Sequence, residues 1–423
     1  MSENNLHTNN NLDGNTSKAK ELLISTIFML PLISGFLSEI LNLFNKNFPT
    51  SIIYLIVFSL ALLSWIICAY ERFFPVIITL VLSAILIPFS LFQTPEAKDY
   101  IFDFGNGTLY EIAQSNILTI FGLCIPLLLL SFCHISVGTL YRYMYRYSAV
   151  SVGLFVLLMI LQIFFVQSKL NYMTVAYNAL PGIAVLFYDS RENHRSLSTV
   201  LWLFGFTGIL LGGCRGALLT LIVLIVLWEM RSLKKADATT VLKIAFVTVV
   251  LVIVILNLTS IAEALDDFLG GFGYSSRLIS KLLGTSSDGD LFIYSDRERI
   301  QQIFIENLDF FGHGILSDRL LAEGEYPHNI ILEILYQFGY LYGFSLMLIL
   351  LVFLVRSHYA ARKSGESFLV FSWLVLLCTI CVKLMFSASY LTDRTFWMFL
   401  GLAVIPFYVK IIPSEDTEIE TIA

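Results

Sequence analysis

Charged side chains are scarce in this sequence: Asp, Glu, Lys and Arg together make up 14% of its 423 residues, whereas a soluble domain carries about 25%. A chain with so few charges and with 57% hydrophobic residues cannot cover a water-facing surface, which excludes an ordinary soluble protein. The charges cluster and leave apolar runs of about 17 to 22 residues, the length that a helix needs to cross a ~30 Å hydrocarbon layer. The sequence therefore predicts an all-α polytopic membrane protein.

Other features are also missing. The first residues lack the apolar segment of a cleavable signal peptide, and residues 1–20, polar and rich in Asn, are expected to form a disordered cytoplasmic N-terminus. Most of the six cysteines lie in apolar runs; Cys378 and Cys381 have the spacing of a redox pair but are expected to be ordinary residues of a membrane helix. No disulfide framework, zinc site or internal repeat is visible, and we expect neither a metal nor a cofactor.

About twelve spans are expected. Helices 1–9 occupy residues 21–259, a large periplasmic loop occupies 260–328, helices 10–12 occupy 329–411, and a cytoplasmic tail occupies 412–423. The expected spans are 22–43, 51–70, 73–93, 115–136, 148–167, 170–188, 197–213, 216–230, 241–259, 329–355, 367–387 and 395–411.

The positions of Lys and Arg predict the orientation. With the N-terminus in the cytoplasm, the inner segments hold fifteen basic residues and the short outer segments hold six. We therefore expect both termini in the cytoplasm. The outer segment 260–328 carries twelve acidic and five basic side chains, many aromatic and aliphatic residues and an amphipathic helix near 296–310, which favours a folded cap over a simple linker.

Three places on the outer side carry polar groups suited to chemistry. Arg215 lies between two glycine-flanked apolar spans, at a depth where an ionisable group often marks function, although a hairpin arginine that reaches for the interface is the alternative. Arg297 and Arg299 lie in the large loop; a guanidinium suits phosphate because it donates two parallel charged hydrogen bonds, although Asp296 and Glu298 are alternative partners.

The third place is where the loop re-enters the membrane. His328 titrates near neutral pH and so suits a general base, Asn329 suits a helix cap, and Glu333 lies one turn further on the same face. A purely structural capping role is the alternative for this group. If the three places face one outer vestibule, they suit an anionic lipid-phosphate substrate whose headgroup lies at the interface.

These residues resemble a known family. Cys-Arg215-Gly-Ala-Leu-Leu, Asp-Arg297-Glu-Arg299, Phe-Phe-Gly-His-Gly and Pro-His328-Asn-Ile-Ile-Leu-Glu333, with Gly339 and Gly343 following, resemble in order and spacing the O-antigen ligase and Wzy-type polymerase superfamily over residues 200–345. The resemblance implies a GT-C type fold and metal-independent, inverting transfer of a polyprenyl-pyrophosphate-linked glycan. It implies that Arg215 and Arg297 bind the pyrophosphate, with Arg299 as the second candidate. His328 would act as the base or orient the acceptor hydroxyl, and Asn329 and Glu333 would complete the binding site.

The implied enzyme is a polysaccharide polymerase for O-antigen or capsule, located in the bacterial inner membrane and acting at its outer face. Its partners would be the lipid-linked oligosaccharide, the bilayer, and a chain-length regulator and a flippase of the same pathway, with no nucleic acid. The ligase that transfers glycan to lipid A core remains the nearest alternative, because it needs the same donor site. A lipid-linked glycan flippase or another transporter is the alternative from a different class. A dolichol-phosphate-sugar type of glycosyltransferase would need paired carboxylates in the first outer loop, and residues 44–50 contain none.

Overall fold

The structure of this chain is a computed structural model. It describes residues 116–117, 119–133, 136–164, 172–212, 214–231, 296–322 and 324–407, together with scattered residues between 25 and 82 and between 263 and 271. Every regular element in these residues is helical, and they contain no strand. The predicted all-α class is therefore confirmed for the part of the chain that the structure describes.

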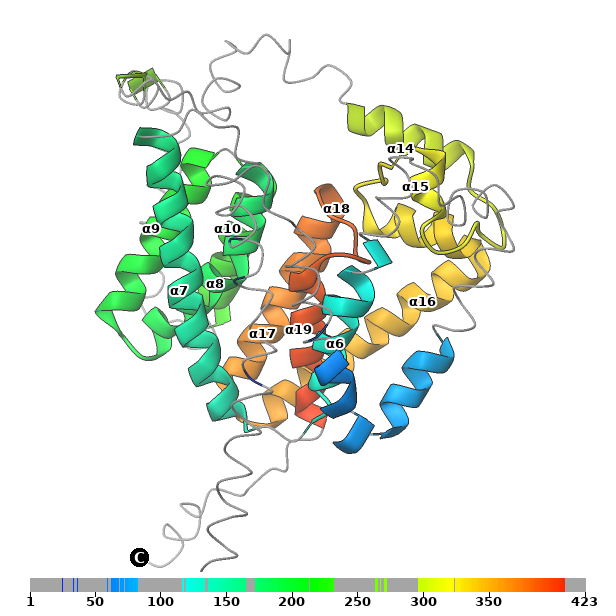
Figure 1. Ribbon diagram of the computed structural model, residues 1–423, viewed down its shortest axis with the longest axis horizontal. Coiled ribbons are helices and arrows are strands. Elements are labelled where there is room, and N and C mark those ends of the chain that lie inside the picture. The colour runs from blue at the N-terminus through cyan, green and yellow to red at the C-terminus, as the bar shows by residue number, and fades with distance from the viewer. Residues whose placement is uncertain are drawn as a thin grey trace, which may run out of the picture.

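Three helices pack on one another on one side of the molecule (Figure 1). They are α7 (Val137–Phe164), α8 (Tyr172–Glu192) and α9 (Ser196–Gly212). Glycines let them approach closely, since a Cβ at Gly205 would lie 2.7 Å from Ile183 and one at Gly208 would lie 2.7 Å from Phe155. Close approach through small residues is typical of helix packing in membranes.

A second group contains α16, α17 and α19, with α6 packed on α19 (Figure 1). Its elements are η1 (Ile120–Cys124), α6 (Ile125–Leu130), α16 (Ile330–Lys363), α17 (Ser367–Cys378), η3 (Thr379–Lys383), α18 (Leu384–Phe386), α19 (Arg394–Val404) and η4 (Ile405–Phe407). Helix α10 (Arg215–Met230) contacts α17 and η3 as well as α8 and α9, so it joins the two groups. The N-terminus of α10 is thereby brought to the second group.

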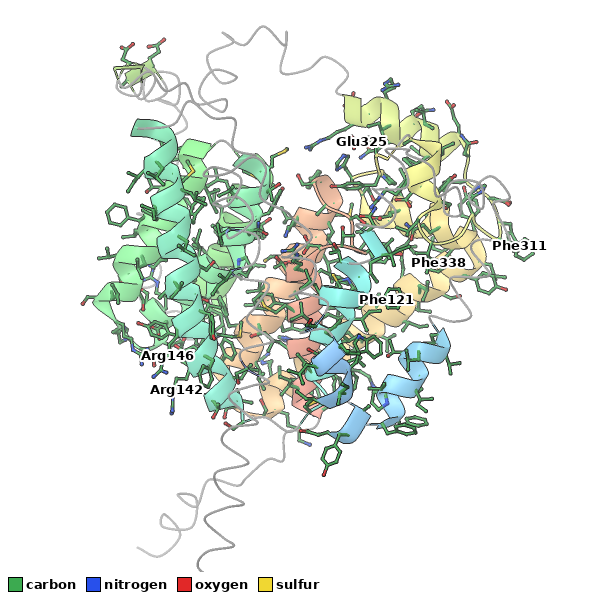
Figure 2. All side chains as sticks on the ribbon, viewed as in Figure 1. Phe121, Arg142, Arg146, Phe311, Glu325 and Phe338 are labelled. Carbon is green, nitrogen blue, oxygen red and sulfur yellow. The ribbon has the colours of Figure 1, made fainter. Side chains whose placement is uncertain are left out.

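Three helices in the described residues are long and apolar enough to cross a membrane: Val137–Leu161, Ile330–Lys363 and Ser367–Phe386. Shorter apolar helices coincide with parts of other predicted spans: Leu62–Glu71, Phe73–Leu82, Ile120–Leu130, Ser196–Gly212, Gly216–Met230 and Arg394–Phe407. Two boundaries differ clearly from the prediction: α7 begins at Val137 and not at 148, and α16 ends at Lys363 and not at 355. The basic residues Arg142 and Arg146, which suggested a loop, lie on α7 near its end (Figure 2).

Helix α16 is interrupted at Gly339, whose φ of 70° and ψ of 178° are not helical. The turn Asp309–Gly314 fills the interruption: His313 N donates to the carbonyl of Tyr336, Gly314 N to that of Gln337, and Tyr340 N to that of Asp309. A Cβ at Gly312 would lie 2.2 Å from the amide nitrogen of Gly339, so both positions require glycine. The Phe-Phe-Gly-His-Gly turn is thus paired with the backbone of α16.

Two short helices of the large loop, α14 (Asp296–Glu306) and α15 (Ser317–Leu321), pack on α16. Helix α14 lies within the amphipathic helix predicted for 296–310. Several predicted segments fall outside the described residues: the termini 1–20 and 412–423, the span 241–259, most of the spans 22–43 and 51–70, and most of the loop before residue 296.

Candidate functional site

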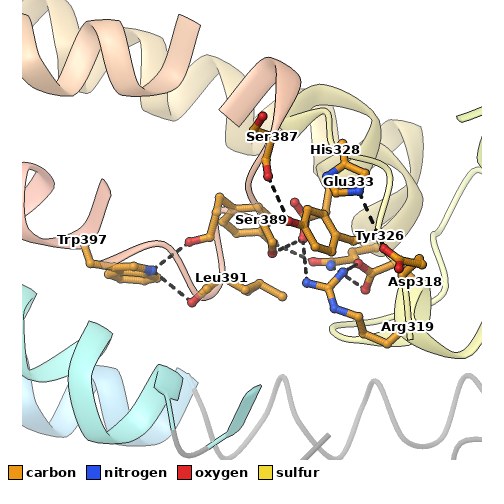
Figure 3. Close-up of polar contacts among 12 residues, drawn as sticks. Asp318, Arg319, Tyr326, His328, Glu333, Ser387, Ser389, Leu391 and Trp397 are labelled. Carbon is orange, nitrogen blue, oxygen red and sulfur yellow. Dashed lines mark hydrogen bonds and ion pairs between the residues drawn. The ribbon is translucent and has the colours of Figure 1, made fainter. Parts of the chain in front are cut away.

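The short segment after α18 brings together parts of the chain that are far apart in sequence. Arg297 Nη1 donates to the carbonyl oxygen of Phe386 at 2.8 Å. Tyr326 Oη donates to the carbonyl oxygen of Ser387 at 3.0 Å (Figure 3). A Cβ at Gly216 would lie 3.0 Å from Ser387 Oγ. Helix α14, the segment before α16 that contains Tyr326, and the first turn of α10 therefore meet at Phe386 and Ser387.

The N-terminus of α10 is one wall of this site. Arg215 is the first residue of the helix, and its N-cap residue Cys214 makes no side-chain capping hydrogen bond. Amide N–H groups in the first turn of a helix favour an anion. The hydroxyl of Tyr177 on α8 also lies here, since a Cβ at Gly216 would be 2.1 Å from it, and this hydroxyl is buried.

His328 lies directly before Asn329, the N-cap residue of α16. The Oδ1 of Asn329 accepts from Ile331 N and Leu332 N at 3.0 and 3.1 Å. The ring of His328 packs on that of Tyr326, with centroids 4.1 Å apart. Burial lowers the pKa of His328 from its ordinary value and Arg297 lowers it further, while Glu325 and the backbone of Ser387 act in the opposite direction. A lowered pKa leaves the imidazole neutral near pH 7, as a base requires.

A buried polar cluster lies beneath His328 and Tyr326 (Figure 3). Arg319 Nη1 pairs with Asp318 Oδ2, and its Nη2 lies 3.7 Å from Glu333 Oε1. Ser389 Oγ donates to the same Glu333 oxygen. Gln337 Nε2 donates to Asp318 Oδ1 at 3.0 Å. Arg319 also lies 4.4 Å from the centre of the Tyr326 ring, so the cluster supports the residue on which His328 packs.

Burial of the cluster and of Tyr326 shifts the pKa values of their side chains. Asp318 and Glu333 are fully buried and Arg319 is nearly so. Burial raises the pKa of Asp318, against the opposing effect of Arg319. Burial also raises the pKa of Tyr326 to about 12, so its hydroxyl remains a donor to Ser387 at neutral pH.

A second buried ion pair lies between η3 and α19. Lys383 Nζ lies 2.6 Å from Asp393 Oδ2 and donates to Thr395 Oγ1 at 3.1 Å. The same ammonium lies 4.8 Å from the centre of the Tyr177 ring. The sequence gave no sign of these contacts, because the partners of Lys383 come from two other helices: Asp393 and Thr395 from the N-terminus of α19, and Tyr177 from α8.

The predicted site residues therefore fall into distinct places. Arg297 and His328 lie at the Phe386–Ser387 segment, as does the backbone of the α10 N-terminus that begins at Arg215. Arg299 is exposed on α14. Asn329 caps α16, and Glu333 is buried in the cluster with Arg319 and Ser389. Tyr177, Tyr326, Lys383 and Ser387 were not predicted.

No group of three or more His, Cys, Asp or Glu side chains suited to a metal occurs among the described residues. Comparison with models of known protein families and with curated proteins gave no match.

Proposed function

We propose that this chain is an inner-membrane polysaccharide polymerase that transfers a polyprenyl-pyrophosphate-linked glycan onto another lipid-linked repeat unit at the outer face of the membrane. About twelve helices would hold it in the bilayer, with both termini in the cytoplasm. The proposal starts from the resemblance of Arg215, Arg297, Arg299 and the His328–Glu333 segment to the O-antigen ligase and Wzy-type polymerase superfamily.

One observation carries the proposal. Arg297, His328 and the first turn of α10 are separated by up to 113 positions in the sequence, yet all three lie at the Phe386–Ser387 segment. Among the described residues Arg297 donates one of its five N–H groups, to the Phe386 carbonyl, which leaves four for a ligand. A phosphate-binding guanidinium, an anion-favouring helix N-terminus and a neutral imidazole are the groups that such a transfer needs.

The chemistry follows from these groups. The anomeric carbon forms a bond to the acceptor oxygen while its bond to the diphosphate oxygen breaks, and that electron pair leaves with the diphosphate. Cationic and N–H groups that stabilise the developing negative charge supply a large part of the acceleration. His328 takes the proton of the acceptor hydroxyl, a contribution of roughly 10²–10⁴-fold. Cleavage of the diphosphate linkage drives the transfer, so the reaction can proceed in an outer compartment that lacks ATP.

The transporter alternative would use the break in α16 as an ion or substrate site, because unwound carbonyls are free there in discontinuous helices. In this chain the carbonyls of Tyr336 and Gln337 at the break accept from His313 N and Gly314 N. Those carbonyls are already engaged, which favours a structural role for the break.

The test compares two arginines of the same helix. Arg297→Ala is expected to abolish long glycan chains, because Arg297 reaches the Phe386 carbonyl, whereas Arg299→Ala on the exposed side of α14 should retain them. Surface glycan chain length is measured in a deletion strain that carries each variant at matched protein levels.

The deletion strain itself separates the two enzymes of the superfamily. Single repeats retained on the core after deletion mean a polymerase, and loss of all core-attached glycan means a ligase. Normal chain length in the deletion strain, or in a well-expressed Arg297→Ala strain, would contradict the proposal.

A further inference from the structure

His328 has a carboxylate beside its accessible nitrogen. Nε2 of His328 lies 3.7 Å from Oε2 of Glu325, whose side chain is 59% exposed, while the histidine side chain is 14% exposed. The other ring nitrogen, Nδ1, is buried. An acceptor hydroxyl can therefore approach only Nε2, the nitrogen that faces Glu325.

The backbone holds this arrangement under strain. His328 has a φ of 54°, in the left-handed region that is unfavourable for a residue with a Cβ. Such conformations persist where surrounding contacts impose them, and they concentrate at functional sites. Here the contacts come from Tyr326, whose ring packs on His328 and whose hydroxyl is bonded to Ser387, and from Asn329, which caps α16. These contacts hold the imidazole in one orientation, with Nε2 toward Glu325.

We propose that Glu325 is the proton acceptor of His328, the group that carries the acceptor's proton from the buried site to water. This role rests on the proposed function, because it requires that His328 take a proton in each turnover. Glu325 suits it because the carboxylate is within ion-pair distance of Nε2 and yet mostly exposed. Figure 2 shows Glu325 at the end of the molecule where α14 and α15 lie (Figure 1).

The proton path balances with the bond changes. The acceptor O–H bond breaks as its oxygen bonds to the anomeric carbon, and the proton goes to Nε2. The imidazolium so formed is stabilised by the Glu325 carboxylate. After the product oxygen leaves, the exposed Glu325 side chain closes the 3.7 Å gap to Nε2, takes the proton and passes it to water. His328 is thereby neutral again for the next acceptor, and the diphosphate retains the electron pair of the broken bond.

Several charged or titratable groups face the imidazole. Arg297 approaches from α14 and Arg319 from α15, and both disfavour the imidazolium. Tyr326 packs on the ring and remains neutral because burial raises its pKa to about 12. Among these groups Glu325 is the one whose charge favours the imidazolium, so its loss has a predictable sign.

The experiment uses Glu325→Gln in the full chain, with Glu306→Gln as the matched control. Glu306 is an exposed carboxylate of α14 that accepts from Gln302. The pKa of His328 is measured by NMR of histidine-labelled protein in detergent, with its signal identified by its loss in His328→Gln. Turnover is measured with lipid-linked repeat units extracted from the deletion strain.

Glu325→Gln is expected to lower the pKa of His328 and to reduce turnover roughly tenfold, less than the 10²–10⁴-fold loss expected for His328→Ala. Glu306→Gln should change neither quantity. Unchanged turnover in Glu325→Gln would overturn the inference, whatever the pKa does. If His328→Ala also retains turnover, the proposed function fails as well, whereas a large loss in His328→Ala alone removes only the role of Glu325.

Discussion

Ionisable side chains that are cut off from water must find their counter-charges nearby, and Arg319 serves this purpose for two carboxyl groups at once. It pairs with Asp318 and approaches Glu333, and all three side chains are buried. Removal of one partner from such a cluster costs more than the cluster contributes, because it leaves charge buried without compensation. Arg319 also packs on the Tyr326 ring, and that ring packs on His328, so Arg319 supports the position of His328 through Tyr326.

We expect Arg319→Met to destabilise the protein by about 3–5 kcal/mol, because Asp318 and Glu333 would then share one buried site without a cation. The thermal unfolding of purified protein in detergent measures this loss. Arg299→Met, an exposed arginine of α14, is the control and should unfold as the parent does. Equal unfolding of the two variants would mean that the cluster is open to water in solution.

At the scale of elements, the break in α16 determines how the cap packs on the apolar helices. The cap is here the described part of the large loop, residues 296–322 and 324–328. The first part of the helix, Ile330–Phe338, is largely buried against the cap and the cluster, and the part after Gly339 has many exposed apolar side chains. Backbone hydrogen bonds from the Asp309–Gly314 turn cross the break. The turn therefore locks the cap, and with it Arg297 and His328, onto α16.

Gly312→Ala and Gly339→Ala are each expected to prevent normal folding. Both residues have positive φ angles, 79° and 70°, and a Cβ at either would lie 2.2–2.3 Å from backbone atoms that cannot move aside. Gly153→Ala in α7 is the matched control: its Cβ would meet nothing within 4 Å, and Ala is the better helix former by up to about 1 kcal/mol. Size-exclusion profiles of the detergent-extracted variants measure the outcome. A monodisperse Gly339→Ala protein would show that the turn and the helix separate readily.

The sequence predicted α9 and α10 to within one residue at each end, but it ended the span of α16 at 355, before Arg356, whereas this helix continues to Lys363. It misplaced the start of α7 because Arg142 and Arg146 suggested a loop, although a helix continues through them. It singled out Gly339 as part of a motif but not as a break, since only the Asp309–Gly314 turn makes a break favourable there. Arg297 and His328 carried a local pattern. Tyr177, Lys383 and Ser387 did not, because their roles arise from contacts between helices that no local pattern encodes.

At the scale of the whole molecule, the cap and the basic end of α7 lie at opposite ends. Figure 2 shows Glu325 at one end and Arg142 and Arg146 at the other. Helix α16 begins beside the cap and extends away from it (Figure 1). Its part after the break, Tyr340–Lys363, is about 36 Å long at 1.5 Å per residue, which exceeds the ~30 Å of a hydrocarbon core. The two ends of this helix should therefore reach opposite membrane surfaces.

This geometry gives a topology test. Gln302 on α14 and Arg362 near the end of α16 are each replaced by Cys in a chain where the exposed Cys381 is changed to Ser. In spheroplasts, a membrane-impermeant maleimide should label Gln302→Cys directly, and it should label Arg362→Cys only after the membrane is made permeable. The chain with Cys381→Ser alone gives the background from the remaining cysteines.

Each other outcome has a definite meaning. If both positions are labelled in intact spheroplasts, α16 does not cross the membrane, and the prediction from its length is wrong. If only Arg362→Cys is labelled, the chain crosses in the opposite sense. The cap with Arg297 and His328 would then face the cytoplasm, where nucleotide sugars are available. The proposed transfer between lipid-linked glycans at the outer face would have no access to this site, so the orientation of one helix decides whether the chemistry is possible.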